Sequence, residues 1–147
     1  MAGEIDAEPE SSVVLLSIRP EYAELIMSGT KKTEFRKVAF ARRITHAVVY
    51  ASSPLKRVLG YFEVAGLDVG SPDRLWSAFR GIAGVPREAF DAYYRNCQFG
   101  CAIKVGRVFA FPKPLSLKDA GCPLTPPQSF AYLGSVAFRR VQFCCRA

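Results

Sequence analysis

The chain has 147 residues and a net charge of +7, and half of its residues are hydrophobic. This length and composition favour one domain with its own core and exclude a chain that is disordered throughout. No apolar run approaches the roughly 20 residues that span a bilayer, and the acidic N-terminus is unlike a signal or transit peptide, so we predict a cytoplasmic protein with no membrane partner.

The chain opens with an acidic segment that differs sharply from the rest. Residues 1–12 hold four of the 13 Asp and Glu residues and none of the 20 Lys and Arg residues, so residues 13–147 carry 20 bases against 9 acids, a net charge of +11. A body this basic repels itself, so its charge favours a polyanionic partner over the alternative of an ordinary basic protein. We predict a disordered tail over residues 1–12 and one domain over residues 13–147.

The first half of the expected domain alternates short strands with one helix. Proline at position 20 suits a helix start, and Gly29 stands where a left-handed C-terminal cap is expected. A Ser-Ser-Pro turn separates the two clearest strand patterns, which are rich in Val, Tyr and Phe. We predict strands at Val13–Ile18, Thr33–Val38, His46–Ala51 and Val58–Val64.

The second half begins with two helices and ends irregularly. Ser71 and Pro72 form a helix start, Pro86 begins another helix, and apolar side chains at helical spacing, among them Trp76, are expected in the core. The later predictions are a strand at Cys101–Phe111 broken by prolines, a helical turn at Phe130–Leu133 and a final strand at Val136–Phe143. Strands outnumber helices, so we predict an α+β fold, a small closed or nearly closed β-barrel with flanking helices.

The segment from Gly29 to Lys37 carries the densest chemistry. Residues two apart in a strand share a face, so Lys32, Glu34 and Arg36 are expected to point one way, with Lys31 in the preceding turn. Cations would hold Glu34 ionised, and the Arg36 guanidinium could present its planar fork to a phosphate or a base edge. The alternative is a solvated, charged edge strand.

This segment reproduces a family signature. Gly29, Lys31, Glu34 and Arg36 match the pattern G-x-K-x-x-E-x-R, and the chain therefore resembles the ASCH domain family of the PUA-like superfamily. Flanking blocks extend the similarity over about residues 13–135. These blocks are Leu16–Tyr22, Val49–Pro54, Gly60–Phe62, Tyr93–Tyr94, Ala102–Gly106 and Pro126–Leu133. The resemblance implies a β-barrel, a cleft between barrel and helices, and RNA-related roles that include binding and hydrolysis.

Three parts of the chain are predicted to meet at the implied cleft: the signature, the turn after residue 50 and the proline-stiffened loop before residue 130. Tyr50 could stack on a base, with a core aromatic as the alternative, and Ser129 could contact a ligand or cap a turn. The candidate catalytic residues are Lys31, Tyr50, Lys56 and Ser129. The candidate nucleic-acid contacts are Glu34, Arg36, Ser52, Ser53 and Gln128.

Three functions remain open at this point. The first is an RNA-binding domain that cleaves single-stranded RNA, since Lys, Tyr and Glu side chains supply acid, base and charge stabilisation. A divalent metal ion could assist, although no dense carboxylate cluster is present to hold it. The second is an amidohydrolase acting on an acylated nucleoside such as N4-acetylcytidine, and the third is a non-catalytic reader of RNA or of a modified base. We expect a monomer.

The five cysteines follow no ligand or disulfide pattern. Their odd number argues against a disulfide framework. Zinc sites usually combine two pairs of Cys or His ligands, whereas Cys97 and Cys101 stand four apart, Cys144 and Cys145 are adjacent, and His46 is the only histidine. We therefore predict free thiols and no metal bound through cysteine.

Overall fold

The computed structural model describes residues 11–146. Its strands are β1 (Ser11–Ile18), β2 (Thr33–Arg36), β3 (Arg43–Ala51), β4 (Arg57–Gly70), β5 (Gly100–Leu115) and β6 (Phe130–Leu133). Its helices are α2 (Pro20–Ser28), α3 (Pro72–Phe79), the 3-10 turn η1 (Arg80–Ile82), α4 (Arg87–Tyr93), α5 (Leu117–Ala120) and α6 (Ser135–Cys144). No helix within residues 11–146 is both long enough and apolar enough to cross a membrane.

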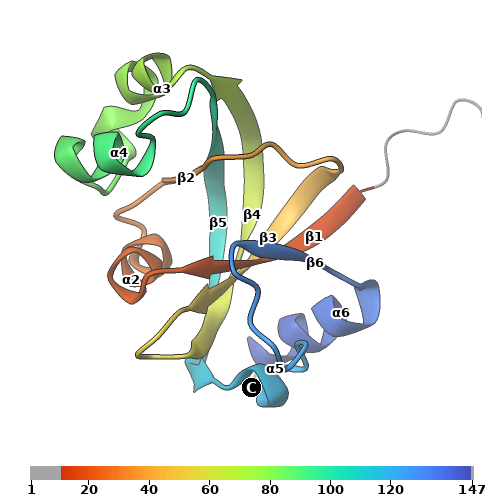
Figure 1. Cartoon of the computed structure of the whole chain (residues 1–147). Coiled ribbons are helices and arrows are strands. Elements are labelled where there is room, and N and C mark those ends of the chain that lie inside the picture. The colour runs from red at the N-terminus through yellow and green to blue at the C-terminus, as the bar shows by residue number, and fades with distance from the viewer. Residues whose placement is uncertain (1–10, 147) are drawn as a thin grey trace, which may run out of the picture.

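The strands form one strongly twisted sheet in the order β2-β5-β4-β3-β1-β6 (Figure 1). β1 and β3 are parallel, and every other neighbouring pair is antiparallel. The α+β class is confirmed. The sheet stays open, however, because β2 and β6 are edge strands that do not pair with each other. The closed or nearly closed barrel expected from the sequence is therefore not confirmed.

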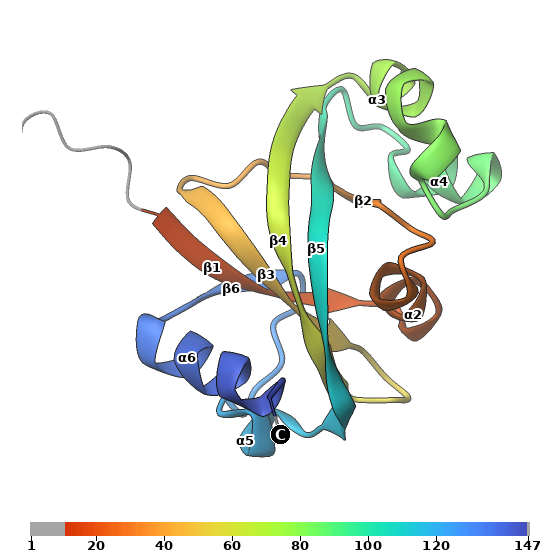
Figure 2. The same cartoon turned by 180° about the vertical axis from the view of Figure 1, so that it is seen from behind.

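Helices cover both faces of the sheet and lie at both ends of its long β4–β5 ribbon. α2 buries Ala23 and Ile26 against the face that also presents Leu16, whereas α6 buries Phe138 and Val141 against the opposite face. Figure 2 shows α5 and α6 together at one end of the long β4–β5 ribbon and α3 and α4 at the other. The α3–α4 pair builds a third cluster against β2, to which Trp76 contributes from a half-buried position.

Two predictions for the C-terminal part are wrong. Phe130–Leu133 is strand β6 rather than a helical turn, because it pairs with Val13–Leu16 of β1 and supplies β-favouring aromatic side chains. Val136–Phe143 lies in helix α6 rather than in a strand. The imperfect alternation there concealed a helical period, since Phe138 and Val141 are buried three residues apart while Val136 is 78% exposed.

Two strands are longer than predicted. β4 continues six residues past Val64, and β5 runs through Pro112 and Pro114, which were expected to end it. Prolines are tolerated at an unpaired strand edge, and β2 pairs with β5 only over Cys101–Lys104, which leaves that edge of β5 open near the prolines.

The boundary of the acidic tail needs a small correction. Most of the predicted tail lies outside the described residues, but Ser11 and Ser12 belong to β1 and pair with Arg43 and Ile44 of β3. Ser12 also accepts a hydrogen bond from Thr45 Oγ1 through its carbonyl oxygen. Ser11 and Ser12 are therefore part of the sheet, two residues before the predicted start of the domain.

This boundary gives a test with an internal control. Removing residues 1–10 should leave the melting temperature unchanged, because the segment has no apolar periodicity. Extending the deletion through Ser12 should lower the melting temperature by several degrees, because it removes the first pairs of the β1–β3 ladder. Thermal melts followed by circular dichroism measure both, and a large loss on deleting residues 1–10 alone would show that the segment packs on the fold.

Candidate ligand-binding cleft

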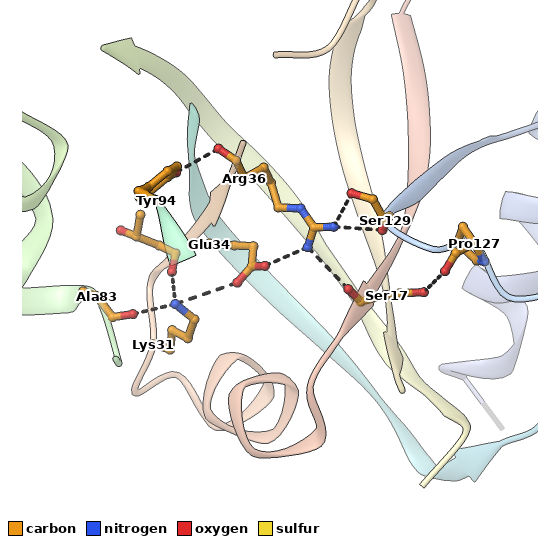
Figure 3. A network of polar contacts seen from close by, with 9 residues as sticks. Ser17, Lys31, Glu34, Arg36, Ala83, Tyr94, Pro127 and Ser129 are labelled. Atoms are coloured by element: carbon orange, nitrogen blue, oxygen red, sulfur yellow. Dashed lines mark hydrogen bonds and ion pairs between the residues drawn. The ribbon is translucent and has the colours of Figure 1, made fainter. Parts of the chain in front are cut away.

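A buried charged network occupies β2 and the turn before it (Figure 3). Arg36 Nη1 donates to Glu34 Oε2 at 2.9 Å, and Lys31 Nζ lies 3.8 Å from Glu34 Oε1. None of the three side chains is more than 9% exposed. Glu34 and Arg36 thus share a face as the strand period predicted, but the third member is Lys31 in the turn, because Lys32 faces solvent.

Arg36 connects the two edges of the open sheet. From β2, its Nη2 donates to Ser129 Oγ at 2.7 Å and to the Ser129 carbonyl at 2.9 Å, immediately before β6. Its Nη1 also approaches the carbonyl oxygen of Ser17 in β1 at 3.4 Å. One planar guanidinium therefore contacts a carboxylate, a hydroxyl and two carbonyl groups, which the point charge of a lysine could not do.

Ser17 holds the loop before β6 from the other side. Its backbone N–H donates to the Ser129 carbonyl at 3.0 Å, and its hydroxyl donates to the Pro127 carbonyl at 2.6 Å. The proline-stiffened loop is therefore fixed to the end of β1 as well as to Arg36 (Figure 3). Ser129 Oγ accepts from Arg36, so its own proton remains able to reach a ligand.

Lys31 ties β2 to the segment between α3 and α4. Its ammonium donates to the carbonyl oxygens of Thr33 at 2.6 Å and Ala83 at 2.5 Å. Gly84, at φ +68°, leaves the space that the lysine stem fills, since a Cβ there would meet Lys31 Cγ at 2.5 Å. Burial lowers the pKa of Lys31 from 10.5, although the neighbouring Glu34 carboxylate acts in the opposite direction.

A cleft of about 850 Å³ opens beside this network, bordered by α2, β2, α4 and the loop before β6. Its volume lies within the range of small-molecule sites. The charged network and the hydroxyl of Ser129 form its polar part. Its aromatic lining consists of Tyr22, Phe35, Phe90, Tyr93 and Phe130. A flat, polar ligand such as a nucleobase would meet both stacking surfaces and hydrogen-bonding groups there.

Several lining residues were missed by the sequence analysis. Arg19, Lys37 and Tyr93 border the cleft, and Lys37 Nζ lies 4.8 Å from the centre of the Tyr93 ring. Burial raises the pKa of Tyr93, although 38% of the residue is exposed. Of the adjacent pair Tyr93 and Tyr94, only Tyr94 is in the core, and its hydroxyl donates to the Arg36 carbonyl at 2.8 Å.

The structure divides the predicted site into two groups. Lys31, Glu34, Arg36, Gln128 and Ser129 line the cleft. The other predicted residues, Tyr50, Ser52, Ser53 and Lys56, are not among the residues that line it. The two groups nevertheless share one end of the sheet.

The second group surrounds the β3–β4 turn. Tyr50 is 4% exposed in the cluster under α5 and α6, so its ring packs as a core aromatic. Its register partner in β1 is Ser17, which itself bonds to Ser129. At the usual spacing of strands, Tyr50 thus lies two strands, about 10 Å, from Ser129. Ser52 N–H donates to the Ile18 carbonyl, and Lys56 is exposed.

The remaining reactive groups are potential metal ligands and the cysteine thiols. Within residues 11–146, no group of three or more His, Cys, Asp or Glu side chains gathers in a metal-binding arrangement. The cysteines are free thiols, and Cys101 and Cys122 are buried. Burial raises the pKa of Cys122 to about 11 and that of Cys145 likewise to about 11, so neither is an activated nucleophile.

Fold and site together define a basic α+β domain with a ligand-sized cleft beside a buried Lys–Glu–Arg network. The model of the ASCH domain family matches residues 16–108, and the chain belongs to this family. The family match includes the whole charged network and ends before the loop that carries Ser129.

Relatives and solved structures agree with this assignment. The chain is 28% identical over 132 residues to an "ASCH domain-containing ribonuclease" from Zymomonas mobilis, which covers 85% of this chain and 86% of that protein. The crystal structure of ASCH from Zymomonas mobilis has a TM-score of 0.81 at 24% identity and covers 90% of this chain and 94% of that chain. A serine-to-alanine mutant of the same protein gives a TM-score of 0.82 at 23% identity over 92% of this chain and 98% of that one.

Similarity also extends to part of a much longer protein. The chain is 26% identical over 128 residues to the ATP synthase subunit alpha of Ureaplasma parvum, which covers 86% of this chain. It spans 16% of the length of that protein and 40% of a ribosomal protein uL22 from the same organism.

The hydrogen bonds of Arg36 to Glu34, Ser129 and Ser17 predict a large loss of stability when Arg36 is replaced. Arg36→Met should lower the free energy of unfolding by about 3–5 kcal/mol, because Glu34 would keep a buried charge with only Lys31 nearby. Lys32→Met removes an equal charge from the exposed neighbouring side of the turn and should change the free energy by less than about 0.5 kcal/mol. Urea denaturation measures both changes, and equal changes would show that the Arg36 contacts do not stabilise the fold.

The lowered pKa of Lys31 predicts that the stability of the protein depends on pH. The folded protein binds fewer protons at this site than the unfolded chain does in the window just below the ordinary lysine pKa of 10.5. The free energy of unfolding contributed by Lys31 should therefore rise with pH through that window. The measurement is the difference between the parent protein and Lys31→Met in urea titrations at several alkaline pH values, and a difference that falls with pH would contradict it.

Proposed function

We propose that this protein is an RNA-binding ASCH domain that cleaves single-stranded RNA. The observation that carries the proposal is the cleft, in which aromatic side chains lie beside a buried guanidinium and an available serine hydroxyl. Aromatic surfaces stack on bases of any sequence, and the planar fork of Arg36 suits a phosphate or a base edge. We further propose that the domain acts as a monomer in the cytoplasm.

Net charge and sequence similarity both support RNA as the ligand. The net charge of +11 on residues 13–147 would attract the phosphate backbone and speed encounter with it. The relative from Zymomonas mobilis, which aligns with most of both chains, carries the name of a ribonuclease. Together these observations favour RNA over an uncharged ligand.

We assign chemical roles to the two groups of predicted residues. Glu34, Arg36 and Gln128 would hold a base or phosphate in the cleft, and Ser52 and Ser53 would contact the neighbouring backbone. In cleavage, the 2′-oxygen attacks the adjacent phosphorus while the bond to the 5′-oxygen breaks. A base must take the 2′-hydroxyl proton, and an acid must give one to the leaving oxygen. Tyr50, Lys56 and Ser129 are the proposed participants, with Lys31 fixing the cleft wall.

An amidohydrolase acting on an acylated nucleoside is the second candidate. It is favoured by the volume of the cleft, which suits one nucleoside, and by Lys31 beside Glu34. For Lys31 to act as the base, it would have to release its bond to Thr33 or Ala83, since its ammonium donates to both carbonyls. A non-catalytic reader needs no such change and would leave RNA bound and intact.

Binding gives the first test. The affinity for labelled single-stranded RNA, measured by fluorescence anisotropy, should fall linearly with salt on a log–log scale, by about 0.7 per phosphate contacted. The cause is the release of counterions when basic side chains neutralise phosphates. An affinity that does not change with salt, or no binding at low salt, would reject RNA as the ligand.

Cleavage gives the second test. Tyr50→Phe, Lys56→Ala and Ser129→Ala should each slow cleavage of single-stranded RNA by about 10²–10⁴-fold if they act as acid, base or positioning groups. Lys113→Ala, which removes an exposed lysine from β5, is the control and should cleave like the parent. Each reaction is repeated with a chelator to test for a divalent ion and with N4-acetylcytidine as substrate. Deacetylation without RNA cleavage would favour the amidohydrolase, and binding without either reaction would favour the reader.

A further inference from the structure

A second cavity, separate from the cleft, lies at the other end of β6. Its volume is about 410 Å³. Two arginines border it, together with four hydroxyl-bearing residues and the amide of Gln142, and among residues 11–146 neither Asp nor Glu lines it. The polar residues concerned are Arg42, Arg139, Ser11, Ser12, Thr45, Ser135 and Gln142. Within residues 11–146, this basic and hydroxyl-rich lining suits an anion.

The two arginines reach the cavity from different elements. Arg42 follows β2 in the loop to β3, where its guanidinium lies 4.3 Å from the centre of the Tyr132 ring and 3.4 Å from Ser12 Oγ. These contacts hold it at the cavity without neutralising it. Arg139 comes from α6, is exposed, and makes no hydrogen bond or ion pair within the described part of the chain, residues 11–146, so its guanidinium is available to a ligand.

β6 connects this cavity to the cleft. Phe130, at the start of β6, lines the cleft, and Leu133, at its end, lines the cavity. At the rise of a β-strand, these residues are separated by about 10 Å. Aromatic contacts follow the same strand, since the Phe130 ring lies 4.7 Å from Phe40 and 5.5 Å from Tyr132. Both cavities fit within the footprint of four or more nucleotides that single-strand binding domains cover.

We propose that the Arg42–Arg139 cavity is a phosphate-binding subsite for the RNA strand whose neighbouring base occupies the cleft. The proposal rests on the RNA-binding function proposed above and extends it to a second point of contact. Guanidinium groups bind phosphate oxygens in a bidentate manner, and the serine and threonine hydroxyls supply further donors. The ligand recognised is a phosphodiester of the backbone, so this subsite adds affinity and register but no base preference.

The decisive experiment compares two double variants of equal charge. Arg42→Met with Arg139→Met removes both cavity arginines. Arg80→Met with Arg140→Met removes two exposed arginines that do not line the cavity, one of them adjacent to Arg139 on α6. For single-stranded RNA, the log–log salt slope should become shallower by about 1.4 in the cavity variant, the equivalent of two phosphate contacts. The control variant should keep a slope close to that of the parent.

Each outcome separates this subsite from the function on which it rests. If the parent protein does not bind RNA, the proposed function fails and the subsite with it. If RNA binds but both double variants change the slope equally, the charge acts diffusely and only the subsite is overturned. Melting curves of both variants guard against misfolding as the cause.

A second measurement uses inorganic phosphate as the probe. Phosphate titrated into labelled protein should shift the amide resonances of Thr45 and Ser135 at the cavity, and these shifts should vanish in the Arg42→Met, Arg139→Met variant while persisting in the control variant. Cytidine, which has no phosphate, should leave these resonances unmoved. Absence of the phosphate shifts in the parent would overturn the subsite, and so would phosphate shifts combined with an unchanged RNA slope.

Discussion

The contact between Arg36 and the loop before β6 is the constraint on which the cleft depends. β2 and β6 are the two edges of the sheet, and they face each other without a ladder of backbone hydrogen bonds. The Arg36 side chain spans the opening to reach Ser129 and Ser17. Burying a guanidinium is costly unless its donors are paired. Here Glu34, Ser129 and Ser17 accept four hydrogen bonds from the two Nη atoms, although Nε has no partner among the described residues.

The same network determines what each charged side chain can do. Glu34 neutralises Arg36 and faces Lys31, so the buried segment holds two cations and one anion. The Lys31 ammonium donates to the Ala83 carbonyl and so connects β2 to the segment between α3 and α4. Lys31 therefore has a structural role at the wall of the cleft. Ser129 differs from both, because it is exposed and keeps a free proton. The outer end of the network is therefore where contact with a ligand is chemically simplest.

The sequence predicted the parts of this site that follow local periodicity. The shared face of Glu34 and Arg36 comes from the two-residue period of a strand, and the cap at Gly29 from its conformational freedom. The partner of Lys31 could not be predicted, because Ala83 lies 52 residues away and contributes only a backbone carbonyl. Basic character near Arg139 and Arg140 is visible in the sequence, but with the segment interpreted as a strand, the residue that faces a cavity could not be identified.

The opening that keeps the sheet from closing is also what gives the protein its cleft. A backbone ladder between β2 and β6 would bring these strands to about 4.8 Å and leave no room between them. A long side chain in place of that ladder keeps the edges apart, and the cleft of about 850 Å³ is lined from β2 by Phe35 and from β6 by Phe130. Both edge strands have only four residues, which limits pairing with other sheets. Short edges joined by a buried arginine thus allow a folded sheet to keep an accessible cleft between its edges.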